Sequence, residues 1–140
     1  MQVPLAALTE PLRATLVGSD ATIERVITDS RLARPGDLFV PLVAERDGHD
    51  FIGAALAAGA TAALSERSAD NLGLGLAARL LLVAHTGAAL NDLAGFARAR
   101  MSGSVIGVTG SVGKTTVKDL MAGVLATKLD RSGGQVSSRL

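Results

Sequence analysis

The segment best suited to do chemistry is GVTGSVGKTT, residues 107–116. Its glycines let the backbone curl so that several N–H groups point inward, and a helix starting here would add partial positive charge. Lys114 would bring a full positive charge to the β- and γ-phosphates of a nucleotide, and the Thr115 hydroxyl could bind Mg²⁺. The segment therefore predicts a phosphate-binding loop.

This loop departs from the common nucleotide-binding pattern, G-x-x-x-x-G-K-S/T. Val108 stands where the first glycine is expected, and the nearby glycines are Gly107 and Gly110. The alternative interpretation is a glycine-rich turn with an exposed lysine. Two observations favour phosphate binding. Lys114 is the first lysine of the chain and follows nine of its eleven arginines, and the flanking residues predict a strand before the loop and a helix after it.

Strand-like and helix-like segments alternate along the chain. Alternating or short apolar runs predict strands over residues 22–28, 38–43, 61–64, 79–84 and 104–109. Helical spacing predicts helices over residues 4–17, 51–58, 86–102 and 113–128. Asp50 and Thr86 are expected to cap the second and third of these helices. Strands that alternate with helices predict a layered α/β fold.

The composition suits a globular protein and excludes several classes of function. Of the 140 residues, 48% are hydrophobic and 19% are charged, with a net charge of +1, so nothing indicates binding to nucleic acid or to an anionic membrane. The absence of cysteine excludes disulfides, thiolate metal sites and cysteine nucleophiles. The N-terminal segment lacks the pattern of a signal peptide or membrane span. We therefore expect a cytoplasmic protein.

Three segments carry a resemblance to one known family: VTGSVGKTT followed by KDLMAGVL, TDSRLARPGDLFVPL, and DGHDFIGAALAAGATAAL. Together they resemble the Mur ligase family of peptidoglycan synthesis. VTGSVGKTT followed by KDLMAGVL is similar to the short ATP-binding loop of these enzymes, T-G-S/T-x-G-K-S/T-S/T, which accounts for the missing first glycine. TDSRLARPGDLFVPL and DGHDFIGAALAAGATAAL resemble their N-terminal domain, so that the resemblance spans residues 22–127. It implies a small mixed α/β Mur-ligase N-terminal domain followed by the first strand–loop–helix unit of a P-loop ATPase domain.

Within the family, Ser111-Val112 in the loop and Lys118-Asp119 after it resemble the MurF type. That type uses ATP and Mg²⁺ to join D-alanyl-D-alanine to UDP-N-acetylmuramoyl-tripeptide by way of an acyl phosphate. Three alternatives stay open. They are the MurE type, which adds the third amino acid, a non-catalytic module that binds a UDP-sugar, and a small P-loop kinase or ATPase. The last is disfavoured because no later strand ends in the aspartate that would hold Mg²⁺.

The resemblance also implies roles for single residues of the ATP loop. Lys114 and Thr115 would be catalytic, and Thr115 would bind Mg²⁺. The residues that bind the nucleotide would be Thr109, Gly110, Ser111, Val112, Gly113, Lys114, Thr115 and Thr116.

On the substrate side, the resemblance implies that Ser30 hydrogen-bonds the uridine diphosphate part, with Asp29 and Arg31 beside it. The alternative is a structural turn in which Asp29 bonds the local backbone. His49 would lie in a second loop near the same pocket, or would serve a structural role at the start of a helix. This loop, residues 44–47, is one residue shorter than in the family.

The resemblance divides the chain into three parts. Residues 1–100 would form the domain that binds the UDP substrate, residues 101–128 would begin the ATP-binding domain, and residues 129–140 would be a disordered tail unlike the family. Sites for the amine substrate and for further Mg²⁺ carboxylates are expected in regions that this chain lacks. We therefore expect a truncated ligase that is monomeric and inactive alone.

Overall fold

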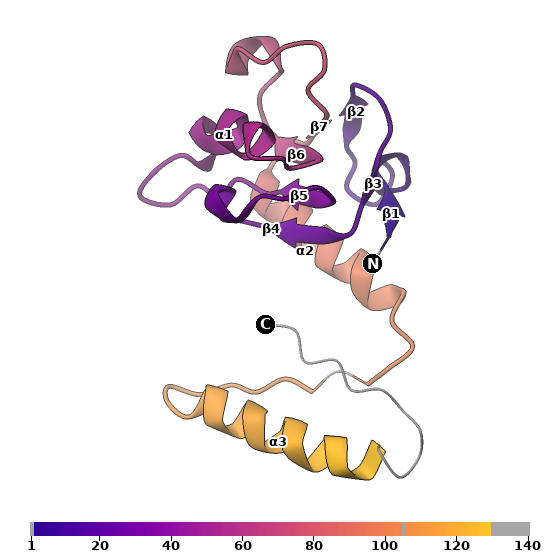
Figure 1. The fold of residues 1–140 in the computed structure, drawn as a ribbon, viewed down its shortest axis with the longest axis vertical. Helices are drawn as coiled ribbons and strands as arrows, with labels where there is room; N and C mark the ends of the chain where they lie inside the picture. The colour runs from indigo at the N-terminus through magenta and orange to yellow at the C-terminus, as the bar shows by residue number, and fades with distance from the viewer. Residues whose placement is uncertain (1, 105, 130–140) are drawn as a thin grey trace. The chain divides into compact units, whose positions relative to one another are not determined.

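The computed structural model describes residues 2–104 and 106–129 of the chain. Contacts within the chain divide it into two compact units, Met1–Met101 and Ser102–Leu140 (Figure 1). The first unit contains a mixed sheet covered by helices, so the predicted α/β fold is confirmed. The functions assigned to the predicted domains stay predictions. Residues 130–140, most of the predicted disordered tail, lie outside the described residues.

The main sheet has five strands in the order β2-β7-β6-β5-β4. Strands β4 to β7 run parallel, and β2 pairs antiparallel with β7 at one edge. A second sheet pairs β1 with β3. The strands are β1 Val3–Pro4, β2 Thr15–Val17, β3 Thr22–Ile23, β4 Arg25–Ile27, β5 Asp37–Phe39, β6 Ala62–Ser65 and β7 Leu80–Leu82.

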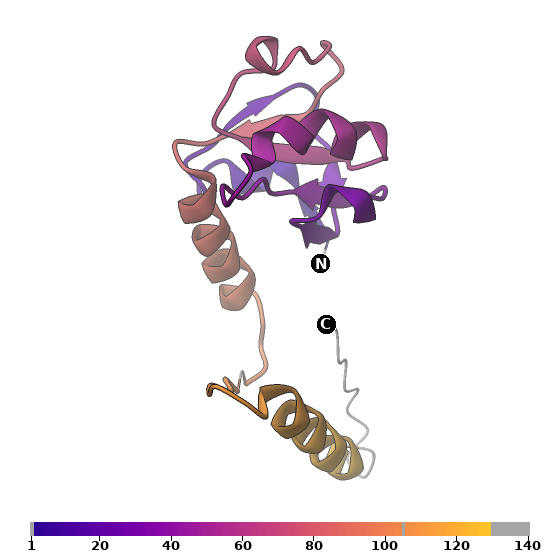
Figure 2. The same ribbon diagram turned by 90° about the vertical axis from the view of Figure 1, so that its left-hand side faces the viewer.

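The parallel strands have a buried core on each face of the sheet. Successive side chains of a strand point to opposite faces, so one strand contributes to both cores. In and after β5, Leu38 and Val40 belong to one core cluster and Phe39 to the other. The first cluster is covered by α2 (Thr86–Ala99) and the 3₁₀ helix η1 (Leu5–Leu8). The second is covered by α1 (Ile52–Ala57), so α1 and α2 lie on opposite sides of the sheet (Figures 1 and 2).

The helix predicted over residues 4–17 is wrong. Only η1 is helical there, and the chain then turns through Arg13, at φ 50°, into β2. The turn lets β2 form hydrogen bonds with β7, which an isolated sequence pattern does not reveal. The leucines at positions 5, 8 and 12 are buried all the same, so their spacing did indicate the core-facing side.

The strand predicted over residues 22–28 is split in two. The N–H groups of Glu24 and Arg25 both donate to the Gly36 carbonyl, at 2.7 and 3.2 Å. This doubled contact marks the point where the chain leaves β3, in the small sheet, and begins β4, in the large one. The three later strands of the first unit form near their predicted places but are shorter or shifted by a residue.

Both predicted helix caps are wrong, because other carboxylates take the role. Asp47, not Asp50, caps the 3₁₀ helix η3 (Gly48–Phe51) that precedes α1. Thr86 is the first residue of α2, and its N–H and hydroxyl both donate to the Glu66 carboxylate, at 2.7 and 3.0 Å. This partner comes from the end of β6, so local sequence could not identify it.

The second unit contains the helix α3 (Lys114–Leu129), as the sequence predicts. The strand predicted over residues 104–109 is absent from the part of that segment that the structure describes. None of the strands within the described residues pairs with this segment, and an unpaired strand has no neighbour to complete its hydrogen bonds. Three residues of the predicted apolar stripe, Val117, Leu120 and Val124, are exposed.

No helix within residues 2–104 and 106–129 is long and apolar enough to cross a bilayer. Over the same ranges, no cluster of three or more histidine, cysteine, aspartate or glutamate side chains could hold a metal ion.

An ion pair joins β4 to β5. The Asp37 carboxylate is buried, and its two oxygens accept hydrogen bonds from Nε and Nη2 of Arg25, both at 2.7 Å. Arg25 also donates to the Leu32 carbonyl at 3.2 Å, and the Arg34 N–H donates to Asp37 at 2.8 Å. The pair therefore holds residues 28–36, the loop between the two strands, and the Arg25 hydrogen bonds keep the pKa of Asp37 below its ordinary value of 3.8.

We expect Asp37→Asn to lower the free energy of unfolding by about 2–3 kcal/mol at neutral pH, because it breaks a pair whose carboxylate is buried. The folded-state pKa of Asp37 is below the unfolded one, so its contribution is complete above about pH 4 and is lost as the pH falls through the folded-state pKa. Urea unfolding at several pH values should show the difference between wild type and variant shrinking below about pH 4.

The matched control is Asp92→Asn. Asp92 is exposed on α2 and has no ion pair or side-chain hydrogen bond within the described part of the chain. Its substitution should change the free energy of unfolding by less than about 0.5 kcal/mol. Equal effects of the two substitutions at pH 7 would contradict a stabilising role for the Arg25–Asp37 pair.

Candidate functional site

A cavity of about 610 Å³ lies at the carboxyl ends of β4 and β5. Because these strands are parallel, the segments that follow them leave the sheet at the same edge, where α/β sheets bind ligands. The wall of the cavity combines hydroxyl, charged and aromatic side chains. The lining residues are Thr28, Asp29, Ser30, Arg31, Phe39, Leu42, Arg46, Gly48, Phe51 and Ala54.

The first wall is built by the turn that follows β4. Asp29 caps the 3₁₀ helix η2 (Ser30–Leu32) by accepting from the Arg31 N–H at 3.0 Å. The Arg31 side chain returns to the same carboxylate with Nε and Nη2, at 2.9 and 2.7 Å. These hydrogen bonds lower the pKa of Asp29 to about 2. Asp29 therefore acts as a local structural cap, and Arg31 is already paired with it.

Ser30 lies between these two charged residues and is half-buried. Its hydroxyl lines the cavity and has no hydrogen-bond partner among residues 2–104 and 106–129. The Thr28 hydroxyl, on the same wall, also has none within those ranges. Both hydroxyls are thus free to bind a ligand.

The second wall is the short loop of residues 42–48. Val43 and Asp47 pair across it, and the Gly48 N–H donates to the Leu42 carbonyl at 3.0 Å. A Cβ on residue 48 would lie 2.6 Å from both the N and the O of Leu42, so the loop closes this tightly only with glycine. Arg46 lines the cavity from this loop and forms no ion pair with any residue that the structure describes. Sequence reasoning missed it, although it belongs to the same polar run as His49.

The floor of the cavity is apolar. Phe39, at the end of β5, is 2% exposed, and Phe51 and Ala54 come from the helical segment that packs above it. Aromatic rings beside free hydroxyls and an unpaired guanidinium suit a ligand that has both a flat apolar group and an anionic group.

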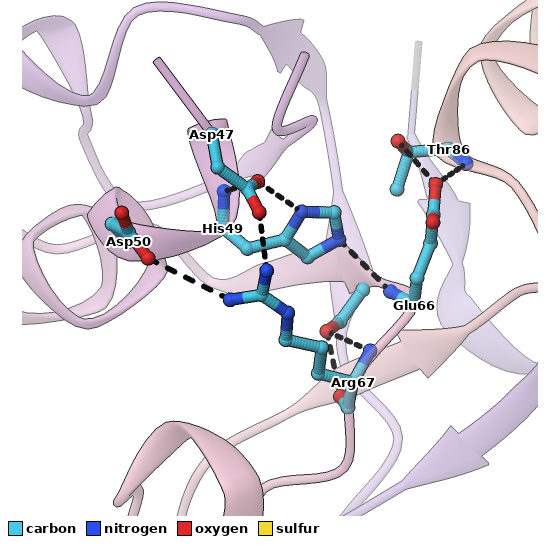
Figure 3. Close-up of polar contacts among 7 residues, drawn as sticks. Asp47, His49, Asp50, Glu66, Arg67 and Thr86 are labelled. Atoms are coloured by element: carbon cyan, nitrogen blue, oxygen red, sulfur yellow. Dashed lines mark hydrogen bonds and ion pairs between the residues drawn. The ribbon is translucent and has the colours of Figure 1, made fainter. Parts of the chain in front are cut away.

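His49 lies behind this wall and is absent from the cavity lining. Its ring is buried, with Nδ1 2.7 Å from Asp47 Oδ1, and Nε2 accepts from the Glu66 N–H at 3.1 Å (Figure 3). Both ring nitrogens are therefore occupied by protein groups. This placement favours the structural alternative for His49 over ligand contact.

The phosphate-loop residues belong to the second unit. Gly110 and Gly113 have φ of 151° and 79°, values that favour glycine, and α3 begins immediately afterwards at Lys114. The Val117 N–H donates to the Gly113 carbonyl at 2.9 Å, so the N–H groups before it in the first turn have no helical acceptor. Lys114 and Thr115 are exposed. This geometry fits an anion site, and nucleotide binding by residues 109–116 stays a prediction.

The sequence is similar to ligases of known name. The UDP-N-acetylmuramoyl-tripeptide--D-alanyl-D-alanine ligase of Escherichia coli strain K12 is 40% identical over 127 residues, which cover 90% of this chain and 27% of that protein. The UDP-N-acetylmuramoyl-L-alanyl-D-glutamate--2,6-diaminopimelate ligase of Syntrophomonas wolfei is 41% identical over 109 residues, which cover 76% of this chain and 22% of that protein. The chain thus spans about a quarter of the length of these curated relatives.

Solved structures agree with the sequence relatives. MurF from Acinetobacter baumannii matches with a TM-score of 0.75 at 30% identity, covering 91% of this chain and 28% of that one. MurF ligase from Thermotoga maritima in complex with ADP matches with a TM-score of 0.58 at 39% identity, covering 75% of this chain and 24% of that one.

No family model matches the chain. Relatives of the D-alanyl-D-alanine-adding type from Escherichia coli, Synechocystis and Bacillus subtilis are 37–44% identical over 82–95% of this chain, which favours this type over the diaminopimelate-adding one, and solved MurF structures share the fold. Sequence and structure lead to the same conclusion: the chain belongs to the Mur ligase family and corresponds to the N-terminal region of the MurF type.

Proposed function

We propose that the cavity binds the uridine diphosphate part of UDP-N-acetylmuramoyl-tripeptide, as the substrate side of a MurF-type ligase. One observation carries the proposal: Asp29, Ser30 and Arg31, the motif that resembles the substrate loop of the family, line the cavity at the carboxyl ends of β4 and β5. The name of the Escherichia coli relative supplies the substrate class.

Different residues of the cavity would bind different parts of this ligand. The Ser30 and Thr28 hydroxyls, free of protein partners in the described structure, would hydrogen-bond the ligand. The guanidinium groups of Arg46 and Arg31 would face the diphosphate, and Arg46 can do so without breaking an existing ion pair. Phe39 and Phe51 would pack against the base.

We further propose that the loop of residues 109–116 binds ATP. Its inward N–H groups and the Lys114 ammonium would neutralise phosphate charge, and the Thr115 hydroxyl would be one ligand of Mg²⁺. The bound metal would screen the charge of the transferring phosphoryl group. The structure of the Thermotoga maritima relative with ADP supports the nucleotide class.

The overall reaction that we propose is that of the relatives. ATP phosphorylates the peptide carboxylate to an acyl phosphate, and the amine of D-alanyl-D-alanine displaces phosphate to form the amide. Because the chain spans about a quarter of these ligases, we expect no turnover by the 140 residues alone. Cytoplasmic location and a monomeric state stay predictions.

Ser30→Ala tests the substrate cavity. We expect UDP to bind the wild-type chain and to raise its melting temperature. The Ser30→Ala variant should bind UDP about five- to tenfold more weakly in calorimetric titration, because one hydrogen bond to the ligand is lost. Ser102→Ala, at a serine outside the cavity, should bind like wild type. Absence of UDP binding, or equal losses for both variants, would contradict the proposed site.

Lys114→Ala tests the ATP loop independently. We expect it to weaken ATP·Mg²⁺ binding at least about tenfold, because a charged hydrogen bond to phosphate contributes about 1.5–3 kcal/mol. Lys118→Ala is the matched control, one turn further along α3, where the ammonium pairs with Asp119 at 3.2 Å. If ATP·Mg²⁺ bound both variants as it binds wild type, the 109–116 loop would not be its site.

A further inference from the structure

The buried imidazole of His49 is held in one tautomer by its neighbours. The Glu66 N–H can only donate, so Nε2 must carry a lone pair. The ring proton therefore sits on Nδ1, which donates to Asp47 Oδ1 at 2.7 Å. Both ring nitrogens are thus bonded to protein groups, and the side chain is 2% exposed.

The hydrogen bonds around His49 form a network with Asp47, Glu66 and Thr86, and one end of this network holds the second cavity wall. The Asp47 carboxylate accepts from the ring and from the backbone N–H of His49, and it also pairs with the Arg67 guanidinium (Figure 3). Asp47 lies between Arg46 and Gly48, two of the three cavity-lining residues of the 42–48 loop. Fixing Asp47 therefore fixes the backbone from which the Arg46 side chain enters the cavity wall.

The other end of the network holds the sheet and α2. Glu66 follows β6 directly and donates its N–H to His49, while its carboxylate accepts both hydrogen bonds from Thr86. These bonds form one continuous series from the cavity loop, through His49, to the first residue of α2 (Figure 3). The loop is thus anchored to the end of β6 and to the start of α2.

We propose that His49 is a positioning residue of the cavity. Its hydrogen bonds to Asp47 and Glu66 hold the 42–48 loop at the end of β6, so that Arg46 faces the diphosphate, and His49 itself does not touch the ligand. The inference rests on the proposed binding of uridine diphosphate. His49 would affect recognition of the phosphates and not of the base, because the 42–48 loop contributes Arg46, which has no ion pair within the described residues.

The test compares UDP with uridine, which lacks the phosphates, by calorimetric or NMR titration. His49→Asn retains a donor toward Asp47 and loses the acceptor for the Glu66 N–H. We expect it to weaken UDP binding about tenfold and to leave uridine binding unchanged, as Arg46→Ala should do. The double variant should bind UDP no more weakly than Arg46→Ala alone, because the two residues act through one contact.

The control is His85→Asn, at the other histidine of the chain, which is exposed and whose side chain forms no hydrogen bond with the network within the described residues; it should bind both ligands like wild type. Asp47→Asn gives a second test, since it weakens the same anchor from the other side, and should show the same phosphate-dependent loss. His49→Gln, whose side chain can still accept from the Glu66 N–H, should recover part of the UDP affinity.

Each other outcome is decisive. If wild type bound UDP and the His49→Asn and Asp47→Asn variants bound it equally well, the positioning role would be wrong while the proposed function stood. Equal losses for UDP and uridine, or additive losses with Arg46→Ala, would show that His49 acts on the ligand or on the whole cavity. If wild type did not bind UDP, the proposed function itself would fail and this inference with it.

Discussion

The pairing of the buried Asp37 carboxylate with Arg25 is the interaction on which the cavity depends. Arg25 and Asp37 are partners in the parallel register of β4 and β5, so the ion pair forms across the first position of both strands. Its remaining hydrogen bonds, to the Leu32 carbonyl and the Arg34 N–H, go to the loop that connects those strands. The same carboxylate therefore sets the strand register and the path of the loop that contains Ser30.

A similar arrangement holds the opposite wall. Behind each wall lies a buried polar group whose hydrogen bonds go to protein atoms: Asp37 for the first loop and His49 for the second. Such groups are costly to bury unless fully bonded, and no buried side-chain nitrogen or oxygen in the described structure lacks a partner. Of the groups that line the cavity, the Thr28 and Ser30 hydroxyls and the Arg46 guanidinium have no partner within the described residues. This division is expected of a preformed binding site.

The sequence predicted the parts of the fold that depend on local pattern. Alternating strands and helices, the start of α3 at the glycine-rich loop, and the loop containing Asp29 could all be inferred. The failures have tertiary causes. Residues 15–17 form an edge strand because β7 lies beside them, and Thr86 does not cap α2 because the Glu66 carboxylate, from another element, accepts the hydrogen bonds of Thr86.

The candidate site was predictable only in part, for the same reason. Asp29, Ser30 and Arg31 were recognisable because they are contiguous, and the structure places them on one wall. Arg46 could not be distinguished from other exposed arginines until the fold placed it beside that wall. His49 has the residue type of a ligand-binding group, yet burial and its two partners direct it into the protein.

The most direct test of the central claim is a two-dimensional ¹H–¹⁵N NMR titration of the ¹⁵N-labelled chain with UDP. If the cavity at the carboxyl ends of β4 and β5 binds uridine diphosphate, the largest saturable shifts will fall on the amides of residues 28–31 and 46–48. Shifts confined to the 107–116 loop, or no saturable shifts at all, would contradict this account.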